Sequence, residues 1–190
     1  MVVMLFPVYV VVRVAYLVAR RRKPDWSREP LNAVCAAYGI ALLSQTLLPN
    51  GIYGIEDLVL FFQGLPPLGY HSYNIVPFHT ISAYLFTQND LVNDWSSVAF
   101  LNLLANVALF APLGPLSAAV SKRFHRFRNV VLLAVSASLS IEVVQFFIGR
   151  SADIDDVILN VIGVCIGWTA WSVFHRIRSA AMRIGTKPST

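Results

Sequence analysis

The sequence predicts an all-α polytopic membrane protein, a bundle of about five transmembrane helices. Hydrophobic residues make up 56% of the chain and charged residues only 13%, whereas an average soluble domain carries about 25% charged residues. Five apolar segments approach the roughly 20 residues that a helix needs to cross a bilayer. Basic residues gather at the ends of these segments, which indicates membrane topology and argues against a nucleic-acid partner.

Charged residues, proline or glycine separate each predicted span from the next. The spans cover residues 2–19, 31–48, 98–120, 130–148 and 154–174. A loop over residues 49–97 joins the second span to the third. Because no internal repeat or separate soluble segment interrupts this pattern, we predict one membrane domain over residues 1–190.

Basic residues predict the orientation of the spans. Of the 15 Lys and Arg residues, all but Arg13 and Arg150 lie on one side of the five-span arrangement. The positive-inside rule therefore places the N-terminus outside and the C-terminus in the cytoplasm. Arg13 lies about two turns from the basic end of the first span. We expect its side chain to extend toward that interface.

The predicted outer loop is long but not simply polar. In residues 54–64, apolar side chains recur at Ile55, Leu58, Val59 and Phe62. This i, i+3, i+4, i+7 spacing predicts a short amphipathic helix that lies in the membrane interface. A second short apolar piece, residues 76–86, follows it.

Polar side chains interrupt the last three spans at related depths. Helical rise places Asn106 and Glu142 each roughly 12 Å from the outer end of its span, and Asn160 roughly 10 Å. The spacings Asn102–Asn106 and Asp156–Asn160 each put two polar groups on one helix face. We therefore predict an outward-facing polar pocket with nine ligand-binding residues: Asn102, Asn106, Glu142, Gln145, Arg150, Asp153, Asp155, Asp156 and Asn160.

Two further features concern how these spans pack. Gly163 and Gly167 are four residues apart, a small-xxx-small pattern that permits close approach of another helix. Pro112 lacks an N–H group and predicts a kink in the third span near Gly114.

Four stretches of the last two thirds of the chain combine apolar and polar residues in a distinctive order: YNIVPF (73–78), NLLANVALFAPLG (102–114), SIEVVQ (140–145) and GRSADIDDVILNVIG (149–163). In the order and spacing of these stretches, the chain resembles the VanZ-like family of bacterial membrane proteins. The matching motif positions are Asn74, Pro77, Phe78, Asn102, Asn106, Pro112, Gly114, Glu142, Gln145, Arg150, Asp153, Asp155, Asp156, Asn160 and Gly163. The resemblance implies a plasma-membrane protein associated with resistance to teicoplanin-type glycopeptides, and it assigns no catalytic role.

Several of these residues support two interpretations. Glu142 is either a hydrogen-bonding group between helices or a functional acid, and intramembrane ionisable groups favour function. Asp153, Asp155 and Asp156 either cap a helix or crowd enough negative charge to hold a divalent cation. Arg150 either pairs with one of these acids or binds a phosphate or carboxylate. His79 is a weaker catalytic candidate beside Glu142.

Three functions fit this pattern. The first is binding of an amphiphile, such as a membrane lipid, a lipid-linked cell-wall precursor or a lipoglycopeptide antibiotic. The second is an intramembrane enzyme in which Glu142 acts as a base and a divalent ion polarises a phosphate. The third is a proton-coupled transporter, which the lack of an inverted repeat disfavours. The sequence carries no nucleophile or zinc signature that would decide whether the protein is an enzyme.

Overall fold

The structure is a computed structural model that describes residues 2–20, 23–47, 73–87, 94–148 and 150–185. Within these residues, four helical segments are long and apolar enough to cross a membrane: Glu29–Leu47, Trp95–Val120, Phe127–Phe147 and Ile154–Met182. A shorter apolar segment, Leu5–Ala19, precedes them and lies within the first helix of the chain. The prediction of an all-helical polytopic membrane protein is confirmed.

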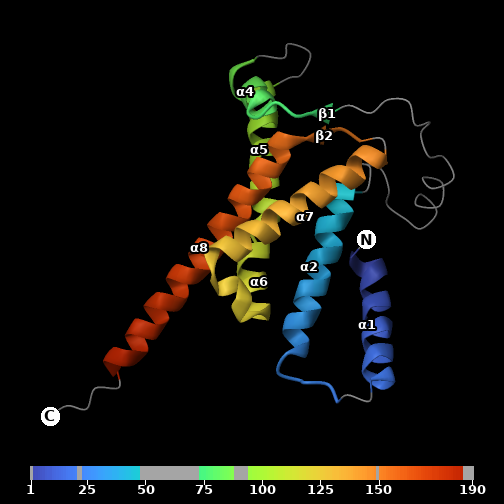
Figure 1. The fold of residues 1–190 in the computed structure, drawn as a ribbon, viewed down its shortest axis with the longest axis vertical. Coiled ribbons are helices and arrows are strands. Elements are labelled where there is room, and N and C mark those ends of the chain that lie inside the picture. Colours follow the sequence, from blue (N-terminus) through green and yellow to red (C-terminus); the bar gives the residue numbers. More distant parts are fainter. Residues whose placement is uncertain (1, 21–22, 48–72, 88–93, 149, 186–190) are drawn as a thin grey trace. The chain divides into compact units, whose positions relative to one another are not determined.

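Figure 1 labels the α-helices and β-strands with the names used below. The first four are α1 (Val2–Ala19), α2 (Glu29–Leu47), β1 (Tyr73–Asn74) and α4 (His79–Phe86). They are followed by α5 (Trp95–Phe110), α6 (Leu113–Val120), the short 3₁₀ helix η1 (Lys122–His125), α7 (Phe127–Phe147), β2 (Ala152–Asp153) and α8 (Ile154–Gly185). The two short strands pair with each other.

The chain forms two compact units. Unit 1 comprises Met1–Tyr73 and Ile141–Ala152, and unit 2 comprises Asn74–Ser140 and Asp153–Thr190. Unit 1 therefore holds α1, α2 and the last turns of α7, whereas unit 2 holds α4, α5, α6, η1, the first part of α7 and α8. The prediction of a single domain stays a prediction.

The helices follow the predicted spans closely, with one extension. Helix α8 begins at Ile154 as predicted but continues to Gly185, beyond the predicted end at residue 174. The added turns include Ser179, Ala180, Ala181 and Met182. Alanine and methionine favour the helical state, so the helix continues after its apolar segment ends.

The third span is interrupted where proline occurs. Helix α5 ends at Phe110 and α6 begins at Leu113, with Ala111 and Pro112 between them. Pro112 cannot donate a hydrogen bond to the carbonyl of Ala108. Nearby, the Gly114 N–H donates to the carbonyl of Ala111 over 3.3 Å in a tighter, i→i+3 pattern. The helix is therefore interrupted close to the predicted position, and a bend of its axis stays a prediction.

Glycines allow α8 to pack tightly against α5 and α6 within unit 2. A Cβ atom at Gly163 would overlap the carbonyl oxygen of Val107, and one at Gly167 would overlap that of Ala111. On the facing side, a Cβ atom at Gly114 would overlap the backbone of α8 at Val164 and Trp168. The predicted small-xxx-small contact is therefore present, and Gly114 contributes a third contact to it.

In unit 1, the side chain of Arg13 has a partner that the sequence interpretation did not include. Arg13 Nη2 lies 2.8 Å from Glu29 Oε1, and Arg13 Nε donates to Glu29 Oε2 over 3.3 Å. This two-point geometry is the strong form of an arginine–carboxylate pair. The guanidinium therefore ends on the first residue of α2, and its extension toward the membrane interface stays a prediction.

The long predicted loop is described only in part. The predicted amphipathic helix over residues 54–64 lies outside the described residues. The second apolar piece, predicted over residues 76–86, contains α4 (His79–Phe86). Helix α4 is too short to cross a membrane.

We predict that Gly163→Ala lowers the stability of unit 2, because the new methyl group meets a backbone carbonyl that cannot turn away. Overpacking of this kind costs about 1–3 kcal/mol. The measurement is the unfolding midpoint of the purified protein in detergent.

The matched control is Gly39→Ala, because a Cβ atom there meets no other atom within 4 Å. Alanine also favours the helix over glycine by about 1 kcal/mol, so the control is expected to unfold at the same or a higher temperature. Equal midpoints for the two variants would contradict tight packing at Gly163.

Candidate functional site

The start of α8 carries three aspartates, and each carboxylate is directed to a different set of partners. Asp153 precedes the helix, and its Oδ1 accepts from the backbone N–H of Asp155 over 2.9 Å. This is the hydrogen bond of an N-cap residue, which satisfies one of the free N–H groups of the first turn. The capping interpretation of Asp153 therefore has a direct structural basis.

Asp155 is fully buried, with 0% of the residue exposed. Its Oδ1 accepts from the N–H of Phe78, and its Oδ2 accepts from the N–H of Ile81 over 3.0 Å. Phe78 is the N-cap residue of α4, and no side-chain capping bond comes from Phe78 itself. Asp155 thus caps α4 from another helix and satisfies the amide groups that α4 leaves free.

This cap stabilises an unusual backbone conformation. Phe78 has a φ of 64°, in the left-handed region that bulky side chains rarely adopt. Such a conformation costs of order 1–3 kcal/mol and persists only where surrounding contacts stabilise it. The bond from the Phe78 N–H to the carboxylate of Asp155 is one such contact.

Asp153 also joins β1 and α4 to the start of α8. Its Oδ2 accepts from the hydroxyl of Thr80, and its Oδ1 accepts from the amide of Asn74 over 3.0 Å. The same Asn74 amide lies 3.1 Å from the Thr80 hydroxyl. Asn74, Thr80 and Asp153 therefore form a closed set of side-chain hydrogen bonds.

Further along α8, polar groups reach two other helices of unit 2. The amide of Asn106 on α5 donates to Asp156 Oδ1 over 2.6 Å. One turn further, Asn160 Nδ2 donates to the hydroxyl of Ser138 on α7 over 2.8 Å. Residues of α5, α7 and α8 thus contribute to one column of polar contacts within unit 2.

One end of this column has an unused hydrogen-bonding group. Asn160 is only 4% exposed, and its Oδ1 has no hydrogen-bond partner among the described residues. The nitrogen and oxygen of such an amide are assigned from their surroundings. In either orientation, the amide offers two hydrogen-bonding ends and Ser138 occupies one of them. A buried polar atom without a partner costs about 1–3 kcal/mol.

The remaining predicted residues belong to unit 1. Gln145 Nε2 and Arg150 Nη1 both donate to the carbonyl of Thr46, over 2.8 Å and 3.0 Å. Thr46 lies in the last turn of α2, where helical carbonyls lack intrahelical donors and the helix dipole favours a cation. Glu142 is 7% exposed. The Oε1 of Gln145 is buried without a described hydrogen-bond partner.

The structure thus brings together some of the predicted residues. In unit 2, Asn106, Asp153, Asp155, Asp156 and Asn160 take part in the contacts described above. In unit 1, Gln145 and Arg150 meet at Thr46, and Glu142 is buried in the same part of α7. That these two groups of residues converge in one outward-facing polar pocket stays a prediction. Asn102 and His79 are exposed.

The geometry of the three aspartates does not form a metal site. Among the described residues, no group of three or more His, Cys, Asp or Glu side chains is placed to hold a metal ion. The carboxylates point to backbone amides, Thr80, Asn74 and Asn106 instead of toward a common point. The residues present therefore do not fit the divalent cation that the acidic pattern suggested.

Sequence reasoning missed three partners. Thr80 lies in the first turn of α4, a position where threonine often makes local hydrogen bonds. Ser138 precedes Glu142 by four residues and so shares its helix face, a signal that could have identified it. Thr46 contributes a backbone carbonyl, and no side-chain pattern could have identified it.

Comparison with known proteins adds one finding. A model of the VanZ/LLP1 family matches residues 35–175, which is more than two thirds of the chain and includes residues of both units. No curated protein and no solved structure matches the chain.

We predict that Asp155→Asn loosens α4, because an amide supplies one acceptor where two backbone N–H groups need one each. The unpaired N–H is expected to cost about 1–3 kcal/mol. Hydrogen exchange of the amides of Phe78 and Ile81 measures the effect, which should be faster in the variant.

The matched control is Asp94→Asn. Asp94 is the N-cap residue of α5, but its side chain makes no capping hydrogen bond, and it is exposed. This variant should leave exchange in α4 unchanged. Slow exchange of both amides in Asp155→Asn would show that the carboxylate does not cap α4.

Proposed function

Since the chain belongs to the VanZ/LLP1 family, we propose that it binds an amphiphilic, lipid-linked ligand of the bacterial cell envelope through polar groups near the start of α8. The proposed ligand class is a membrane lipid, a lipid-linked cell-wall precursor or a lipoglycopeptide antibiotic. Binding of this kind would contribute to resistance against teicoplanin-type glycopeptides.

The observation that carries this proposal is the buried amide of Asn160 with one end unused. Its Oδ1 accepts hydrogen bonds, so a hydroxyl, amide or ammonium group of a ligand would satisfy it. Sugar and peptide head groups are rich in such donors. Interhelical hydrogen bonds in membranes contribute only about 0.6 kcal/mol on average, so structural bonding alone is a weak reason to retain this amide.

Exposed apolar side chains next to the polar contacts supply the other half of an amphiphile site. The segment that contains Asn74 and Thr80 also exposes large hydrophobic groups to its surroundings. They are Ile75, Val76, Phe78, Leu85 and Phe86. A ligand with an acyl chain could lie along this surface while its head group reaches the polar end of α8.

The distribution of basic residues supports an external location for these groups. If the connectors rich in Lys and Arg lie in the cytoplasm, then α8 enters the membrane from outside at Asp153 and its partners. The polar groups would then face the compartment in which wall precursors and glycopeptides are found. This orientation, with the N-terminus outside, is part of the proposal.

We expect Asn160→Leu to remove binding while the protein still folds, because leucine has the same branched skeleton of side-chain heavy atoms and no hydrogen-bonding group. Loss of one buried hydrogen bond to the ligand weakens binding roughly 5- to 150-fold. The measurement is the inhibitory concentration of teicoplanin for cells expressing each variant, with a glycopeptide that lacks an acyl chain as the comparison drug.

Two controls separate binding from structure. Ser138→Ala removes the partner of Asn160 but keeps the amide, so resistance should persist. Thr169→Val changes an exposed hydroxyl on α8 that bonds only within its own helix, to the carbonyl of Cys165, and should have no effect. Equal loss of resistance in Ser138→Ala and Asn160→Leu would assign Asn160 a purely structural role and refute the proposal.

A second substitution tests whether proton transfer is involved. Glu142→Gln preserves size and hydrogen bonding but cannot accept or release a proton. If Glu142 takes part in binding, as the sequence pattern predicts, teicoplanin resistance should largely survive this change and should fall with Glu142→Leu. Complete loss in Glu142→Gln, at normal expression, would instead favour an enzyme or a proton-coupled transporter.

A further inference from the structure

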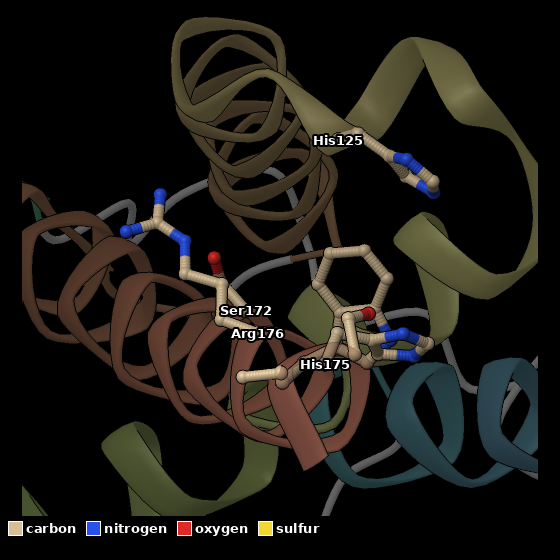
Figure 2. Close-up of a pocket in the computed structure, with 7 residues that line it drawn as sticks. His125, Ser172, His175 and Arg176 are labelled. Atoms are coloured by element: carbon tan, nitrogen blue, oxygen red, sulfur yellow. The ribbon is translucent and has the colours of Figure 1, made fainter. Parts of the chain in front are cut away.

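A separate pocket lies in unit 2 near the C-terminal end of α8, away from the polar contacts at its start. Its volume is about 470 Å³. The distance along the helix from Asn160 to Trp171 is roughly 16 Å. The lining side chains used below are His125, Trp171, Ser172, His175, Arg176 and Ser179. Figure 2 shows His125 reaching from η1, and Ser172, His175 and Arg176 from α8.

Hydrogen bonds fix the wall that η1 contributes. The indole Nε1 of Trp168 donates to the carbonyl of Phe124 over 2.8 Å, which ties η1 to α8. The Nε2 atom of His125 lies 3.1 Å from the carbonyl of Ala118. Because a carbonyl only accepts hydrogen bonds, this nitrogen carries a hydrogen atom and the ring is oriented.

Both imidazoles lie against the same indole ring. The ring centroid of Trp171 is 4.9 Å from that of His125 and 4.5 Å from that of His175. The two histidines, which come from sequence positions fifty residues apart, are thereby held on neighbouring sides of one aromatic group. The contact between His125 and Trp171 therefore joins the η1 wall of the pocket to the α8 wall.

The chemistry of the lining is that of an anion site. The guanidinium, the His175 imidazole and two hydroxyl groups can donate hydrogen bonds to an anion, and no carboxylate is among the lining residues. Three further basic residues flank His125 in the sequence, namely Lys122, Arg123 and Arg126. Arginine with other donors in fixed positions is the usual arrangement for phosphate recognition.

The length of α8 places this pocket at the depth of lipid head groups. The hydrocarbon core is about 30 Å thick, which about 20 helical residues cross at 1.5 Å each. Counted from Ile154, the core ends near Phe174, directly before His175 and Arg176. Tryptophan is enriched at this boundary because its ring is apolar and its N–H is polar.

We propose that this pocket binds the phosphate of an anionic phospholipid, with Arg176, His175 and His125 around the head group and Trp171 beneath it. Basic pockets between transmembrane helices are a known way of holding acidic lipids. This site is distinct from the amphiphile site at the start of α8, and it does not depend on the function proposed there.

The test uses the full-length protein purified in detergent, with native mass spectrometry to count bound lipids during titration with phosphatidylglycerol. The variant Arg176→Gln replaces the charged guanidinium with a neutral amide, and His175→Leu removes the imidazole together with its hydrogen-bond donor. We expect each to weaken the first binding event about tenfold or more. Both residues are exposed, so folding should be preserved, and unchanged elution on size exclusion checks this.

The matched control is Arg178→Gln, which removes the same charge two residues further along α8, outside the pocket lining. It should bind phosphatidylglycerol like the unmodified protein, and phosphatidylcholine should bind weakly to all variants. Equal weakening by Arg178→Gln, or equal retention of phosphatidylcholine, would overturn the proposal. Full displacement of the lipid by inorganic phosphate at equal concentration would show a site for free phosphate and overturn the assignment to a lipid.

Discussion

The requirement that buried backbone N–H groups find an acceptor governs the region around the start of α8. In an apolar environment each unsatisfied N–H group costs several kcal/mol. Helix α4 begins with Phe78 in a left-handed conformation and without a capping side chain of its own. The carboxylate of Asp155 supplies the missing acceptors, and Asp153 connects β1 and α4 to the same point. The position of α4 relative to α8 therefore depends on these two acids.

Close helix packing makes the other polar contacts of unit 2 geometrically possible. Gly163 lets the backbone of α8 approach Val107, which lies next to Asn106 in the sequence. Since Asp156 lies two turns before Gly163, this approach brings it within hydrogen-bonding distance of Asn106. Larger residues at Gly163 would separate the helices and with them the donor and acceptor. Apolar packing and polar pairing in this unit are thus parts of one arrangement.

Local sequence patterns were sufficient to predict the helices and several of their faces. Continuous apolar segments predicted the spans, Pro112 marked the point where the third span is interrupted, and the spacing of Gly163 and Gly167 predicted a close contact. Helical geometry also placed Asp156 and Asn160 on one face, but the partner of Asn106 is Asp156 and not Asn160, whose depth it was expected to share. These features depend mainly on residues that lie near one another in the chain or on the thickness of the membrane.

Partners contributed by distant backbone groups could not be predicted in this way. The three aspartates suggested a cation site because side-chain charge is visible in a sequence, whereas the N–H groups of Phe78 and Ile81 that engage Asp155 are not. Likewise, the expectation for Arg13 was based on its distance from the basic end of the first span and named no acidic partner. Its actual partner, Glu29, becomes a neighbour only when α1 and α2 come together.

The capping of α4 by Asp155 also has a consequence for biosynthesis. The acceptor lies 77 residues after the amide of Phe78 that it binds, so the ribosome completes α4, α5, α6 and α7 before the carboxylate exists. During that interval the first turn of α4 has no acceptor from α8. The short helix therefore reaches its final place only after the last transmembrane segment has been inserted, which makes its docking a late event in the maturation of the newly made chain.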